Sequence, residues 1–181
     1  MDFYSIGKRF YQTYKKEDGS FFKGLIGKPS LTGRYTNYVV NGMMLFTSMD
    51  CDIKAGDIFT SQAGRIMMVM DNAEEESCGP TQKAFTLRVL TKYVSWQRQV
   101  DVINEITGLK ETTEMKDMGN FWCSFEQSGN ITDNMHITVG KYLFVCNKDL
   151  KEGDIIDGKY RITKSDNLVG VTVANAAKCL E

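Results

Sequence analysis

The stretch Asp52–Phe59, DIKAGDIF, returns near the end of the chain as Asp149–Ile156, DLKEGDII. Both copies place a lysine, one further residue and then Gly-Asp-Ile. The glycine supplies the positive φ that a tight hairpin turn requires, and the aspartate can accept backbone N–H groups of that turn. The phrase therefore predicts two hairpin turns with a structural role, formed around Gly56, Asp57, Gly153 and Asp154.

The repeat extends beyond this phrase on both sides. Upstream, the segment 42–46, GMMLF, corresponds to 140–144, GKYLF. Downstream, each copy continues into an apolar strand, residues 65–69 and 159–163, followed by an Asp-Asn pair and a further alternating strand. A repeated order of this kind indicates a duplicated structural unit.

The duplication predicts a mainly β protein built of two related small antiparallel β-barrel or sandwich units with an N-terminal α-helix. We expect the helix in residues 1–20, the first unit in 21–110 and the second in 111–181, and the two units could pack as one domain. The polar stretch 110–118 is the predicted boundary. A short helix is also predicted from Val100 to Ile106, ended by Gly108.

The N-terminal helix is predicted from apolar residues on one helical face, namely Phe3, Ile6, Phe10 and Tyr14. That face could pack on its own unit or dock on a neighbouring subunit. Paired methionines raise the same question in the strands, since consecutive residues point to opposite sides of a sheet. The candidate interface residues are Phe3, Phe10, Tyr14, Met43, Met44, Met67, Met68 and Trp96.

The composition argues for a globular protein outside the membrane. The 181 residues are 42% hydrophobic and 25% charged, with a net charge of −1 and an isoelectric point of about 5.9. A strongly basic nucleic-acid binder is not indicated. No apolar run approaches the length of a membrane span, and the N-terminal residues do not resemble a signal peptide, so cytoplasm-like conditions are expected.

Few residues suggest catalysis or metal binding. The five cysteines are scattered without a CxxC pair, and His136 is the one histidine, so no metal site is expected. No phosphate-binding or dinucleotide-binding glycine motif occurs, so no cofactor is expected. Asp57 and Asp154 could form a two-carboxylate acid–base site, but turn capping is the preferred interpretation. We therefore predict no enzymatic activity and no catalytic residues.

The segment 149–162, DLKEGDIIDGKYRI, resembles the Gly-Asp hairpin of neck proteins of tailed bacteriophages, the head-closure and head–tail joining proteins. The resemblance implies a structural virion protein that forms a ring between portal and tail, assembled in the cytoplasm of a bacterial host. It implies contacts with itself and with portal, adaptor or tail components, and non-specific DNA passage, without a membrane.

Two other functions remain as alternatives. A nucleic-acid-binding β-barrel could use Tyr93, Trp96 and Arg98 for base stacking and phosphate contact. An enzyme could carry a scattered site at Cys123 or His136.

Overall fold

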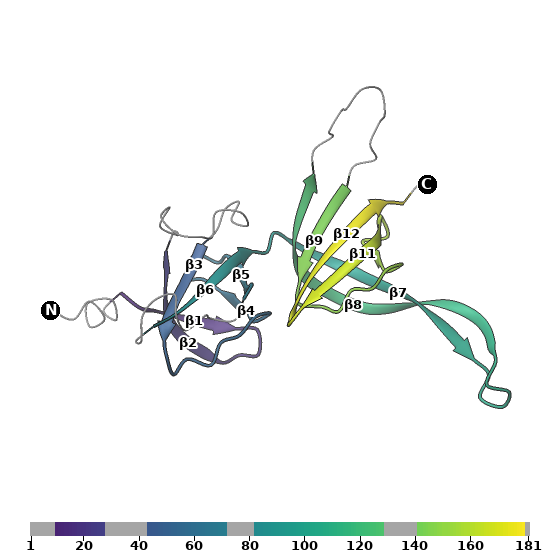
Figure 1. Ribbon diagram of the computed structural model, residues 1–181, viewed down its shortest axis with the longest axis horizontal. Coiled ribbons are helices and arrows are strands. Elements are labelled where there is room, and N and C mark those ends of the chain that lie inside the picture. The colour runs from purple at the N-terminus through teal and green to yellow at the C-terminus, as the bar shows by residue number, and fades with distance from the viewer. Residues whose placement is uncertain (1–9, 28–42, 72–81, 129–140, 180–181) are drawn as a thin grey trace, which may run out of the picture. The chain divides into compact units, whose positions relative to one another are not determined.

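The computed structural model describes residues 10–27, 43–71, 82–128 and 141–179, and the chain divides into two units, Met1–Leu90 and Thr91–Glu181 (Figure 1). Every regular element in the described residues is a strand, as the mainly β prediction requires. Within those residues there is consequently no helix that could cross a lipid bilayer.

The first unit forms a closed barrel of antiparallel strands. Around the barrel the strands follow the order β1-β2-β3-β6-β5-β4, and β4 pairs again with β1 to close it. The strands are β1 (Gln12–Lys16), β2 (Phe21–Gly27), β3 (Met43–Ser48), β4 (Ile58–Thr60), β5 (Ile66–Val69) and β6 (Gln82–Val89).

The second unit repeats this connectivity. Its order around the barrel is β7-β8-β9-β12-β11-β10, which is the first order with each strand replaced by its counterpart in the second half. The closing contact is short, since β10 pairs with β7 only at Ile155↔Gln97 and Ile156↔Trp96. The strands are β7 (Lys92–Ile103), β8 (Lys110–Ser128), β9 (Lys141–Cys146), β10 (Ile155–Ile156), β11 (Tyr160–Leu168) and β12 (Val171–Lys178).

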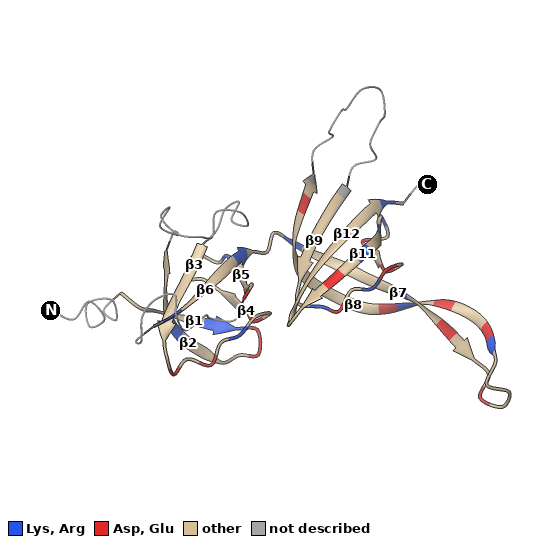
Figure 2. Ribbon diagram, in the orientation of Figure 1, with Lys and Arg blue, Asp and Glu red and all other residues tan. Residues whose placement is uncertain are grey.

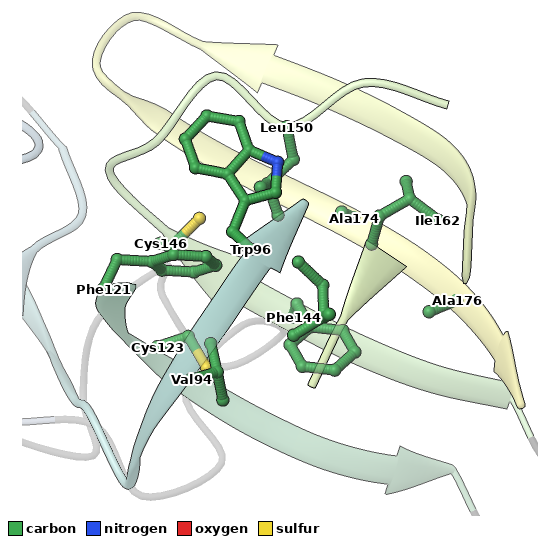
Figure 3. Packing of buried hydrophobic residues seen from close by; sticks show 11 residues of the cluster. Val94, Trp96, Phe121, Cys123, Phe144, Cys146, Leu150, Ile162, Ala174 and Ala176 are labelled. Atoms are coloured by element: carbon green, nitrogen blue, oxygen red, sulfur yellow. The ribbon is translucent and has the colours of Figure 1, made fainter. Parts of the chain in front are cut away.

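Each barrel interior is filled by side chains. In the first, the rings of Tyr14, Phe22 and Phe59 pack with centroids 5.1 to 5.4 Å apart. In the second, Trp96 meets Phe121 edge to face at 5.9 Å, and both belong to the core drawn in Figure 3. Alternation along the strands produces these cores because every second side chain points inward.

The two Gly-Asp turns have the same backbone geometry. Gly56 has a φ of 88°, donates its N–H to the Val69 carbonyl at 2.8 Å, and Val69 donates back to the Asp57 carbonyl at 3.0 Å. Gly153 has a φ of 91° and makes the same exchange, with Ile162 at 2.9 Å in place of Val69. The positive φ at the third turn position fits a type II turn, which selects glycine there.

The predicted N-terminal helix is not found, because residues 12–16 form β1 and residues 1–9 lie outside the described residues. Tyr14 points into the barrel as the buried residue of a strand. Aromatic and β-branched residues such as Tyr14 and Thr13 suit strands, and pairing with both β2 and β4 outweighs the helical spacing of the aromatics.

The boundary predicted at residue 110 is also wrong, since the units divide between Leu90 and Thr91. Residues 110–118 belong to β8, where a polar composition reflects solvent on both faces rather than a linker. The predicted helix 100–106 is instead the end of β7 and a turn, in which Gly108 has a φ of 67°.

The turn geometry predicts the effect of replacing Gly153. Gly153→Ala should lower the free energy of unfolding by about 1–2 kcal/mol, because the left-handed backbone is unfavourable for residues with a Cβ atom. No atom lies within 4 Å of an added Cβ, so backbone strain is the whole cost. Urea unfolding measures the change. Asparagine tolerates this backbone conformation better than alanine does, so Gly153→Asn should lower the free energy of unfolding by less. An alanine variant as stable as the wild type would contradict the positive φ at this position.

Candidate functional site

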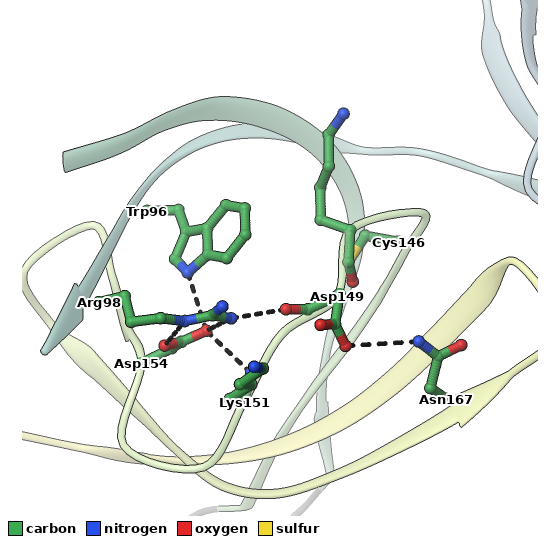
Figure 4. Close-up of polar contacts among 8 residues, drawn as sticks. Trp96, Arg98, Cys146, Asp149, Lys151, Asp154 and Asn167 are labelled. Atoms are coloured by element: carbon green, nitrogen blue, oxygen red, sulfur yellow. Dashed lines mark hydrogen bonds and ion pairs between the residues drawn. The ribbon is translucent and has the colours of Figure 1, made fainter. Parts of the chain in front are cut away.

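The Gly-Asp turn of the second barrel carries a buried carboxylate. Asp154 is 1% exposed and accepts four hydrogen bonds (Figure 4). Trp96 Nε1 donates to Oδ2 at 2.9 Å, and Arg98 donates through Nε and one terminal nitrogen at 2.8 Å each. The backbone N–H of Lys151 supplies the fourth bond at 2.8 Å. This set of contacts is called the Asp154 cluster below.

The Asp154 cluster joins β7 to the turn before β10. Arg98 also donates to the Asp149 carbonyl at 2.6 Å, so one guanidinium holds both ends of the turn sequence. Its hydrogen bond to Asp154 raises the pKa of Arg98, against the opposing effect of burial, and the charges of Asp154 and Asp149 add to the rise. The guanidinium is therefore charged at every physiological pH.

The first barrel has a corresponding cluster with a lysine. Lys16 lies 3.1 Å from the Asp57 carboxylate and donates to the Asp52 carbonyl at 2.9 Å. Lys54 donates its backbone N–H to Asp57 at 3.1 Å, as Lys151 does to Asp154. Asp57 is more exposed, at 17% of its side chain, and the described contacts contain no aromatic donor to it. The first cluster is thus a looser version of the second.

The contacts of Asp57 and Asp154 distinguish turn capping from a two-carboxylate acid–base site. Each lies in its own barrel on a turn and is paired with a cation of the first strand of that barrel. The four hydrogen bonds that Asp154 accepts all come from donors of the fold, so its carboxylate is held in place by the turn and β7. The arrangement supports the turn-capping interpretation, and a two-carboxylate site has no support in either cluster.

The predicted stacking strand is largely committed to the same cluster. Trp96 is 8% exposed and Arg98 is bound to Asp154, so neither side chain can stack on a base or contact a phosphate. Tyr93 is exposed and packs on Trp122 with ring centroids 5.2 Å apart. One exposed aromatic pair is a much weaker basis for nucleic-acid binding than the strand predicted from sequence.

Most of the predicted interface residues lie in the barrel interior or under cover. Four of the candidate interface residues, Tyr14, Met67, Met68 and Trp96, are buried within their own unit and so offer no exposed surface to a partner. A closed barrel turns alternate residues inward, and the sequence pattern does not say which set is covered. Met43 and Met44 are half-buried, Phe10 is 63% exposed, and Phe3 lies outside the described residues.

Among the described residues of the second unit, the β7–β8 hairpin projects beyond the barrel (Figure 1). Pairing runs from Gln97↔Asp117 to Ile103↔Lys110. β10 reaches β7 only at residues 96 and 97, and β9 meets β8 only from Ser124 onward. Residues 97–118, called the arm below, therefore form a ribbon of two strands.

The arm ends in an ordered apolar tip. Ile106 is 95% exposed and Leu109 is 69% exposed, with Ile103 beside them at 59%. The tip is shaped by Asn104, whose side-chain oxygen accepts the N–H groups of residues 106 and 107, and whose N–H binds the carbonyl of Leu109 at 2.9 Å. The turn thus holds large apolar side chains in water, although nothing in the ribbon's own packing requires them there.

Charges accompany the apolar residues along the arm (Figure 2). Lys110 pairs with Asp101 at 2.6 Å on the exposed surface. A hollow of about 310 Å³ opens between the base of the arm and the turn at 151–154. Its lining mixes both signs of charge, with Arg98 and Lys110 already paired, so it favours no particular ligand charge.

The thiols of the second barrel are poorly suited to nucleophilic chemistry. Burial raises the pKa of Cys123 to about 12, and burial raises that of Cys146 to about 11. Since the thiolate is the reactive form, Cys123 is essentially neutral near pH 7. His136 lies outside the described residues. In the described ranges no group of three or more potential metal ligands comes together.

The fold and the two clusters define a two-barrel β protein whose halves share one strand order. No family model, no curated protein and no solved structure matches the chain. The arm was missed in the sequence, although the alternation across residues 97–103 and the Asn and Gly of the tip could have indicated it.

The Asp154 cluster predicts unequal effects of matched substitutions. Asp154→Asn should cost about 3 kcal/mol of unfolding free energy, because it removes the charge of a carboxylate that is 1% exposed and accepts four hydrogen bonds. Asp57→Asn should cost about 1 kcal/mol, since that pair is partly hydrated. Urea unfolding of both variants checks this. Similar losses for the two would contradict the structural difference between the clusters.

The buried thiols predict both labelling and pH dependence. Iodoacetamide at about pH 8 should modify Cys179 well before Cys123 and Cys146, and peptide mass spectrometry reads the order. Because these two thiols ionise at higher pH when folded, stability should be constant below the ordinary thiol pKa of 9.0 and fall as pH rises toward 11. Cys146→Ala should weaken that fall. Equal labelling of all cysteines in the native protein would contradict the burial.

Proposed function

We propose that this protein is a structural virion protein of a tailed phage, a neck, head-closure or tail-completion component that joins portal and tail in a ring. The observation that carries the proposal is the arm, a projecting ribbon whose ordered tip exposes Ile106 and Leu109. Apolar side chains held in water by a defined turn are typical of a surface that becomes buried in an assembly.

The Gly-Asp hairpins support the same role. The same turn geometry occurs in both barrels and contributes to barrel closure. The carboxylates of the two turns are bound by donors of the turn and of the neighbouring strand. The residues that could suggest chemistry are thus used for structure. The sequence resemblance to phage neck proteins rests on this same hairpin, so it points to a shared scaffold.

The packed cores constrain how such a ring would pass DNA. Both barrel interiors are filled by aromatic and aliphatic side chains, so neither can serve as a channel. A DNA channel would have to lie between copies of the chain. The near-neutral charge suits non-specific passage, since tight phosphate binding needs clusters of Lys and Arg.

Replacement of the tip residues tests the proposal. Ile106→Ser combined with Leu109→Ser should reduce incorporation into particles by at least about tenfold, because burial of one such side chain is worth 1.5–3 kcal/mol. Stability should change by less than about 0.5 kcal/mol, since both side chains are exposed. Quantitative mass spectrometry of purified virions measures incorporation.

Leu168→Ser is the matched control, because Leu168 is 62% exposed near the β11–β12 turn and is not in the arm. It should leave incorporation unchanged. Absence of the wild-type protein from mature particles would contradict the virion assignment. Equal incorporation of the tip variant and the control would show that the arm is not the contact.

A further inference from the structure

We propose that two copies of this chain pair through the free edge of β8 in the arm, as antiparallel strands around a two-fold axis at Met115. The starting observation is that the ribbon has open edges. Among the described residues, no strand pairs with the outer edge of β8 from Lys110 to the region where β9 joins at Ser124. Such an edge presents backbone N–H and C=O groups to any strand that can lie beside it.

A ribbon of two strands also becomes more stable when further strands are added to its edge. A two-stranded hairpin is marginal in water, whereas a sheet of more strands with an apolar surface is stable. Joining two arms edge to edge would place the strands in the order β7-β8-β8-β7. Met115, which is 47% exposed and lies opposite Gln99 in the ribbon, would then meet the Met115 of the second copy.

The charges of β8 select this register. With Met115 opposite itself, Glu114 of each copy faces Lys116 of the other, and Thr113 faces Asp117. Glu114 and Lys116 are exposed, and among the described residues neither has an ion-pair partner. The second copy would place an opposite charge beside Glu114 and beside Lys116, which gives two symmetric ion pairs. No like charges would face each other.

Neighbouring registers are less favourable. Centring the pair on Thr113 would put Lys110 opposite Lys116, centring on Glu114 would oppose two glutamates, and centring on Lys116 would oppose two lysines. Like charges directly opposite are destabilising.

A register centred on Thr112 is the strongest rival. It would pair Lys110 with Glu114, but Lys110 is already bound to Asp101 at 2.6 Å. It would also draw on the turn residues before β8, where Gly108 has a φ of 67°. The Met115 register needs neither change. It uses residues 113–117, which lie within β8 and before the positive φ of Gly119 at 93°.

This contact is isologous, with the same surface used by both copies. It leaves Ile106 and Leu109 at the tip outside the paired segment. The inference goes beyond the proposed function, because a ring is closed by heterologous contacts whereas this two-fold contact is isologous, and the two can therefore fail separately. A dimer can form in solution whether or not the protein enters particles.

Charge reversal tests the pairing on the full-length protein. Glu114→Lys alone would oppose two lysines, and Lys116→Glu alone would oppose two glutamates, so each should weaken the dimer by at least about tenfold. The double variant E114K/K116E should dimerise as the wild type does. Mixing the two single variants should form a heterodimer, because every facing pair is then complementary. Sedimentation velocity at about 0.1 M salt measures each case.

Cysteine cross-linking fixes the register. Met115→Cys places two thiols opposite each other at a separation that fits a disulfide, and oxidation should give a covalent dimer absent from the wild type. Thr112→Cys is the matched control, since it would cross-link only in the rival register. A monomeric wild type, single variants that dimerise normally, a mixture that stays monomeric, or cross-linking through Cys at 112 would each overturn the proposal.

Discussion

The structure of the second barrel depends on one ion pair, between the buried Asp154 carboxylate and the Arg98 guanidinium. β10 contributes only two residues to the ladder that closes the barrel. So short a strand offers few backbone bonds, and the closing contact needs support from side chains. The carboxylate supplies it by binding Trp96 and Arg98 of β7 while capping its own turn at Lys151. A buried charge with every partner in place specifies one arrangement, because any slip would leave it unpaired.

The first barrel is closed by a corresponding set of weaker side-chain contacts. Lys16 replaces the guanidinium, and Tyr14, two residues before Lys16 as Trp96 is two residues before Arg98, packs on Phe22 and Phe59 instead of binding the aspartate. The shared strand order and turn bonds show that backbone topology survives such exchanges. The first barrel also lacks a counterpart of the arm among its described residues, since β1 and β2 are short. The difference between the halves thus lies in one hairpin, which carries the exposed apolar residues and the open edge.

That contrast explains why the duplicated motif does not mark the proposed assembly surface. Both copies of the motif are engaged in closure, with Asp57 and Asp154 each paired with a cation of the first strand of its barrel. The arm has no counterpart among the described residues of the first barrel. Beyond Arg98 at its base, it presents charged and apolar side chains on a two-stranded ribbon whose outer β8 edge faces solvent. Surfaces for assembly are drawn from such elements, because residues committed to a core cannot also bind a partner.

The sequence by itself determined the β class, the two Gly-Asp turns and the paired order of strands around them. Those features follow from local chemistry, namely the φ that Gly56 and Gly153 adopt, the short reach of an aspartate to its own turn, and alternation along strands. Only the tertiary structure decided that residues 12–16 are a strand, that Trp96 and Met67 are buried, and that residues 97–118 leave the barrel. Each of these depends on partners distant in sequence, and whether a given face is covered is a property of the neighbouring strand rather than of the residue.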